Sequence, residues 1–151
     1  MKTVLALGAL AALFPSAFAL TQGTYTIGSA SLAKNQVLSK YTDVDHLFFD
    51  QMNDLRLQTW NFLPRDDLNE FVIQNGDYQD YINCGAELGS LCTTGDKQEV
   101  YIVEQVENGY EFVSKESGYF LRVDGENLRV SEWNSSPEQT LVLAPYTPES
   151  L

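Results

Sequence analysis

The 151-residue sequence is poor in the residue types on which many enzymes and metal sites depend. It has one histidine, His46, two cysteines, and 9 basic residues against 21 acidic ones. The apolar run within the first nineteen residues is too short to cross a bilayer, and no second long apolar segment follows. The net charge of −12 would repel phosphate backbones and anionic lipid, so we expect neither nucleic acid as a partner nor membrane insertion.

Residues 1–19 have the pattern of a secretory signal peptide. Lys2 precedes an apolar run, which ends at the small-residue cleavage site Ala17–Ala19. We therefore expect a secreted, extracellular protein with a single domain over residues 20–151. Loss of Lys2 would bring its net charge to −13.

The two cysteines are close in sequence, in the stretch "NCGAELGSLC". In an oxidising compartment such a pair predicts one disulfide, between Cys84 and Cys92. Closing this short loop would stabilise the fold by roughly 2–3 kcal/mol. A zinc site is not expected, because two thiolates without a nearby histidine supply too few ligands.

The sequence also lacks a convincing amphipathic helix. Short alternating runs rich in aromatic and β-branched residues recur instead, such as "GTYTIG", "EFVIQ", "EVYIVE", "YFLRV" and "TLVLA". Turn signals such as "NGD", "ENG" and "DGEN" separate them. Turns recurring about every 11 residues are typical of an all-β sandwich or barrel.

Three units of about 40 residues cover nearly all of residues 20–151. They are marked by Gln58, Gln98 and Gln139, at spacings of 40 and 41, and each is followed two positions later by an apolar residue: Trp60, Val100 and Leu141. One hairpin pair cannot bury its apolar face alone, whereas three units around a pseudo-threefold axis can. The expected core residues are Tyr25, Ile27, Phe48, Trp60, Phe62, Phe71, Ile73, Tyr101, Val103, Tyr110, Phe112, Leu121, Val123, Leu141 and Leu143.

This pattern resembles the ricin B-type lectin family, in the form of its secreted fungal members. The third unit, "GYEFVSKESGYFLRVDGENLRVSEWNSSPEQTLVLAPY", follows the family pattern from end to end. The second carries its cysteine pair where family members often have one. The first departs from the pattern, with "VDHLFFDQMNDLR" where a plain hairpin is expected. The resemblance implies a β-trefoil and a non-enzymatic, carbohydrate-binding protein.

The resemblance also implies where sugar would bind. A unit with an active site in this family has an aspartate after an early strand, an aromatic ring and a polar residue near Gln-x-Trp. In the third unit Arg122 stands at the aspartate position, so Asp124 is expected to replace it. Trp133 falls at the position that stacks on sugar, and Gln139, after Glu138, at the polar position. The expected carbohydrate-binding residues are therefore Asp124, Trp133 and Gln139.

The other two units match the binding motif less well. Asn83, with Asp80 nearby, stands at the aspartate position of the second unit, and Ser39 at that of the first. Asn134 begins the sequon "NSS" directly after Trp133, which makes it the expected N-glycosylation site. A glycan there would crowd the third unit's pocket.

Other chemistry finds little support in the sequence. No Gly-x-Ser-x-Gly motif accompanies His46. Asp43, Asp45 and His46 could form part of a metal site, but the surrounding loop does not fit an EF-hand. We expect no enzyme activity, no metal and no cofactor, with a carbohydrate or glycoprotein as partner. The alternative is a protease inhibitor or interaction module that uses the long segment 40–56, with a protease as partner.

Overall fold

The computed structural model describes residues 20–147, and the expected signal peptide lies outside the described residues. Twelve strands form one connected sheet, with four strands in each sequence unit. In this range no helix is long and apolar enough to cross a membrane.

Each unit contributes four strands in the same order. The first unit contains β1 (Gly23–Ser29), β2 (Gln36–Ser39), β3 (Phe48–Gln51), the 3-10 helix η2 (Arg56–Gln58) and β4 (Trp60–Pro64). The second contains β5 (Glu70–Asn75), β6 (Tyr81–Asn83), β7 (Thr93–Gly95) and β8 (Tyr101–Val106). The third contains β9 (Gly109–Ser114), β10 (Phe120–Asp124), β11 (Asn127–Ser131), the 3-10 helix η3 (Pro137–Gln139) and β12 (Leu141–Pro145).

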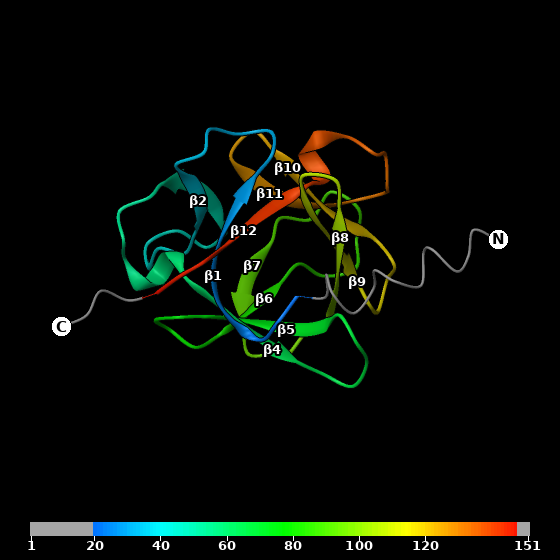
Figure 1. Ribbon diagram of the computed structural model, residues 1–151, viewed down its shortest axis with the longest axis horizontal. Coiled ribbons are helices and arrows are strands. Elements are labelled where there is room, and N and C mark those ends of the chain that lie inside the picture. The colour runs from blue at the N-terminus through cyan, green and yellow to red at the C-terminus, as the bar shows by residue number, and fades with distance from the viewer. Residues whose placement is uncertain (1–19, 148–151) are drawn as a thin grey trace.

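The first and last strands of the units close into a six-stranded barrel. Antiparallel pairing runs from β1 to β4, β5, β8, β9, β12 and back to β1, and Figure 1 shows β1 and β12 side by side. The hairpins β2–β3, β6–β7 and β10–β11 contact one another through the bridges Asn127–Phe48 and Leu91–Arg129. This is the predicted β-trefoil, in which closure leaves the barrel without an exposed edge.

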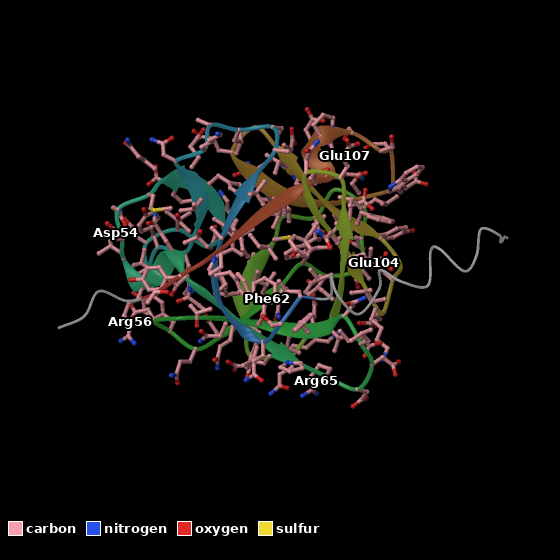
Figure 2. All side chains as sticks on the ribbon, in the orientation of Figure 1. Asp54, Arg56, Phe62, Arg65, Glu104 and Glu107 are labelled. Carbon is pink, nitrogen blue, oxygen red and sulfur yellow. A yellow bond between two sulfur atoms is a disulfide. The ribbon has the colours of Figure 1, made fainter. Side chains whose placement is uncertain are left out.

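Phe62 lies at the centre of the core, as Figure 2 shows. Its ring makes edge-to-face contacts with Tyr25, Phe71 and Phe112, at centroid distances of 5.3, 5.9 and 5.9 Å. The predicted core residues are buried except for three that are half-buried: Phe48, Tyr110 and Leu143. In β3 the alternation turns Phe49 inward instead, with none of its surface exposed.

The predicted counterpart of the Gln-x-Trp motif in the second unit is wrong by one residue, although Tyr101 and Val103 are buried in the core as expected. Gln98 is exposed and Val100 is half-buried, whereas Tyr101 is fully buried and pairs with Phe71. Trp60 pairs with the first strand of its own unit in the same way. The repeat of Gln-x-Trp in this unit is therefore Glu99-x-Tyr101, and a shift by one residue would have reversed the inward and outward faces.

The first unit has a longer connection between its two hairpin strands than the third, in which only residues 125–126 join β10 to β11. Eight residues, 40–47, connect β2 to β3, and nine residues, 84–92, connect β6 to β7 in the second unit. Residues 48–51 of the segment form β3 and Arg56 begins η2, while Leu47 and Phe49 belong to the core. The core thus accounts for much of the segment that seemed unexplained in the sequence.

The expected disulfide between Cys84 and Cys92 is present and closes the connection from β6 to β7. This loop is hydrogen-bonded to a strand of the third unit. Gly89 N donates to Val130 O at 2.8 Å, and Cys92 N donates to Leu128 O at 2.8 Å. The disulfide loop therefore forms a wall beside β11.

Candidate functional site

Trp133 lies on the connection between β11 and η3, with 57% of its surface exposed. Its indole Nε1 donates a hydrogen bond to Glu111 Oε2 at 3.2 Å, which holds the ring in place. Trp133 borders a surface hollow of about 520 Å³. We call this the Trp133 hollow, and its lining residues are Leu88, Gly89, Arg122, Arg129, Val130, Ser131, Glu132, Trp133 and Asn134.

The Trp133 hollow is built by two sequence units. Leu88 and Gly89 come from the disulfide loop of the second unit, and the other lining residues come from the third. Arg129 Nη1 donates to Gly89 O at 2.7 Å and ties the two walls together. Leu88 is 49% exposed, so two apolar side chains, Leu88 and Trp133, are presented to solvent here.

Asp124 lies beside the hollow without lining it. It ends β10 and is half-exposed, and its Oδ2 forms an ion pair with Arg129 Nε at 2.9 Å. Asp124 thus fixes the position of Arg129, which itself borders the hollow.

Gln139 does not reach the hollow, because its side chain is fully buried. Its Nε2 donates to Glu132 O at 2.6 Å, and its Oε1 accepts from Asn134 N at 2.9 Å. These bonds brace the loop on either side of Trp133. The role predicted for Gln139 in contacting sugar is therefore replaced by a structural one.

The first unit contains the same brace around a different side chain. Gln58 Nε2 donates to Gln51 O at 2.9 Å, and Gln58 Oε1 accepts from Asn53 N at 2.9 Å. Met52 thereby occupies the position of Trp133. Ser39, at the aspartate position, is fully buried and accepts a hydrogen bond from Gln58. Met52 borders a different hollow, of about 580 Å³, whose other walls come mainly from β1, the connection to β2, and β12.

The second unit lacks the loop that would carry an aromatic ring. Arg129 pairs with Arg122 and precedes Gln139 by ten positions, whereas Thr93 pairs with Asn83 and precedes Glu99 by only six. Asn83 Nδ2 donates to Lys97 O at 2.7 Å, so this side chain is held by the shortened loop. Asp80 is paired with Lys40 at 3.2 Å.

Asn134 is exposed and lies in the lining of the Trp133 hollow. Its Oδ1 accepts a hydrogen bond from Ser136 N at 3.0 Å, which leaves the side-chain nitrogen without a hydrogen-bond partner among residues 20–147. A glycan attached at that nitrogen would start at the edge of the hollow.

The remaining candidates from the sequence form no comparable site. The ring of His46 lies 3.4 Å from an Asp45 carboxylate oxygen. No group of three or more His, Cys, Asp or Glu side chains that could hold a metal occurs within residues 20–147.

No family model and no curated protein matches the chain. Solved structures do resemble it. A Macrolepiota procera ricin B-like lectin in complex with lactose is 13% identical with a TM-score of 0.72, over 84% of this chain and 99% of that one. A Polyporus squamosus lectin bound to the epitope Neu5Acα2-6Galβ1-4GlcNAc is 18% identical with a TM-score of 0.72, over 83% of this chain.

The chain spans only 50% of the length of the Polyporus lectin chain. An endo-β-galactosidase from Clostridium perfringens that releases GlcNAcα1-4Gal also matches, at 14% identity and a TM-score of 0.71, over 82% of this chain and 32% of the enzyme chain. At these identities the likeness concerns architecture. The chain thus has the β-trefoil fold that ricin B-like lectins share.

Proposed function

We propose that this protein is a secreted, non-enzymatic carbohydrate-binding protein, and that sugar binds in the Trp133 hollow. The observation that carries the proposal is the exposed indole of Trp133, held by Glu111 at the edge of a hollow with polar walls. Indole rings present a flat apolar face on which the apolar face of a pyranose packs. The polar lining residues supply donors and acceptors for sugar hydroxyls.

The exposed apolar side chains at the hollow indicate a binding site. Leu88 and Trp133 both expose about half of their area and lie on the same hollow. Exposed apolar patches bordered by polar groups often mark interaction sites. The hollow is open to solvent, so we expect weak binding.

The arrangement also favours binding over hydrolysis. Glycosidases use two carboxyl groups on either side of the scissile bond. Among the lining residues of the hollow, Glu132 is the only carboxylate. Of the neighbouring carboxylates, Asp124 is held in its pair with Arg129 and Glu111 in its hydrogen bond with Trp133.

The similar structures support the same class of ligand. The Macrolepiota lectin is seen with lactose, and the Polyporus lectin with a sialylated trisaccharide. We propose that the present chain likewise recognises glycans, through its third unit.

A glycan array, followed by isothermal titration calorimetry of the best hits, tests the proposal. Trp133→Ala should weaken binding about tenfold or more, because buried tryptophan contacts dominate many interfaces. Met52→Ala removes the side chain at the same position of the first unit and should leave binding unchanged. If the unaltered protein binds no sugar at millimolar concentration, the proposal fails.

The segment that motivated the protease-inhibitor alternative is partly accounted for by the fold. Residues 40–47 form a connection one residue shorter than its counterpart in the second unit, though six residues longer than that in the third, and residues 48–51 build β3. An assay of protease inhibition by the intact protein tests this alternative.

A further inference from the structure

Arg122 points out of the core into the Trp133 hollow. In β10 its neighbours Leu121 and Val123 are buried, with 1% and 2% of their surface exposed. Strand alternation therefore places Arg122 on the outer face, where it is half-buried and lines the hollow together with Trp133.

Arg122 combines partial burial with the lack of an ionic partner in the described part of the chain. Within residues 20–147 it makes no ion pair and no side-chain hydrogen bond, in a chain with 21 acidic residues. The basic residues that pair with carboxylates, at 2.9–3.2 Å, are Lys40, Lys97, Lys115 and Arg129. The other basic residues without an ion pair are all exposed: Lys34, Arg56 and Arg65. Arg122 is thus the unpaired cation that is partly shielded from water.

The cross-strand neighbour of Arg122 is also a cation, and their repulsion destabilises the fold. Arg122 and Arg129 stand directly opposite each other on the hairpin β10–β11. Like charges opposite each other in a sheet are destabilising. Asp124 and Gly89 O occupy the guanidinium of Arg129, but they do not contact that of Arg122. A bound anion would remove this repulsion.

The chemistry of the free side chain suggests which anion. A guanidinium presents a planar fork of N–H donors that matches a carboxylate in two parallel hydrogen bonds. An indole on the same hollow offers a surface for a sugar ring. A sugar residue that carries its own carboxylate, such as a sialic or uronic acid, would satisfy both groups at once.

We propose that the Trp133 hollow binds carboxylated saccharides, with Arg122 as the carboxylate-binding residue. This rests on the proposed function of the hollow and adds the class of ligand. Arg129 is a positioning residue here, since Asp124 and Gly89 already occupy it.

Calorimetric titration with three matched sugars tests the proposal: 6′-sialyllactose, its carboxyl methyl ester and lactose. The free acid should bind at least about tenfold more tightly than its ester, as expected for charge-assisted hydrogen bonds. Added salt should narrow this difference. An oligogalacturonide, tested in parallel, distinguishes a uronic acid source of the carboxylate from a sialic acid source.

Variants of the chain identify the residue responsible. Arg122→Gln should remove the preference for the free acid and leave lactose affinity unchanged. Arg122→Lys should restore only part of it, because an ammonium lacks the fork. Arg65→Gln is the matched control, since it removes the same charge from an exposed site labelled in Figure 2. Thermal unfolding of each variant checks that the fold is intact.

The outcomes separate this proposal from the one on which it rests. If acid and ester bind equally, or if Arg122→Gln keeps the preference, the carboxylate assignment is overturned. Binding of lactose that Trp133→Ala weakens would still support the proposed function. Sulfated lactose bound as tightly as 6′-sialyllactose would contradict a carboxylate site in favour of a general anion site. Absence of binding to every sugar would overturn both proposals.

Discussion

Two buried glutamines show how single residues serve fold and site in this protein. Gln58 and Gln139 make the same pair of hydrogen bonds to the backbone of the preceding loop, at nearly the same distances. The loop of the first unit presents Met52, and the loop of the third presents Trp133. The glutamine therefore shapes the loop, whereas the residue on the loop decides what the surface can bind.

This parallel predicts the effects of two matched substitutions. Gln58→Ala and Gln139→Ala should each lower the free energy of unfolding by roughly 1–3 kcal/mol, because buried backbone groups lose their partners. Only Gln139→Ala should also weaken sugar binding, since it loosens the loop of Trp133. Chemical unfolding and calorimetric titration measure the two effects. Equal loss of sugar affinity in both variants would contradict the assigned roles.

At the level of the elements, an ion pair joins the second and third units. Glu70 in β5 is 5% exposed, and its carboxylate lies 3.0 Å from Lys115 Nζ, just after β9. The hydrogen bond from Lys115 is the main cause that holds the pKa of Glu70 below its usual value. The same bond raises the pKa of Lys115.

The lowered pKa of Glu70 predicts that the free energy of unfolding falls at acid pH. The pair contributes fully above the usual carboxyl pKa, near 4.3 in the unfolded chain. This contribution is lost as the pH falls through the lower pKa of the folded state, because the unfolded state then binds more protons. Urea unfolding between neutral and strongly acid pH should show a smaller acid-induced loss of stability for Glu70→Gln than for the unaltered protein. An identical pH dependence of the two would contradict it.

At the level of the whole molecule, the expected glycosylation site adjoins the Trp133 hollow. The strong negative charge favours solubility and argues against nucleic acid partners. Asn134 combines a sequon with a place in the lining of the hollow. We therefore propose that a glycan at Asn134 competes with ligand for this surface.

Expression of the full chain in a eukaryotic secretory host tests this. We expect a secreted product that begins at Leu20, with a glycan at Asn134, as measured by mass spectrometry. Ser136→Ala removes the sequon while keeping the Ser136 backbone N–H that bonds Asn134, and its hydroxyl has no partner within residues 20–147. The variant should bind sugar more tightly than the glycosylated protein. Equal affinity would contradict competition, and retention inside the cell would contradict secretion.

The sequence by itself determined the three-unit barrel. Strand alternation, turn residues and the spacing of the Gln-x-Trp repeat are local signals. They are still recognisable in the third unit, where Leu141 stands at the position that Trp60 has in the first. Local signals placed Tyr101 in the expected core, but they could not choose between Val100 and Tyr101 as the counterpart of Trp60. That choice depends on pairing with β5, a strand about thirty residues earlier.

Only the tertiary structure decided the composition of the site. It buried Gln139, paired Asp124 with Arg129, and brought Leu88 of the second unit beside Trp133 of the third. The bonds of Gln139 and the pair of Asp124 with Arg129 lie within the third unit, but they depend on the folded geometry of its hairpin and loop. Leu88 and Trp133 come from different units, so no motif within one unit predicts that they line the same hollow. The physical reason is packing around the pseudo-threefold axis, which places the disulfide loop of one unit against the hairpin of the next.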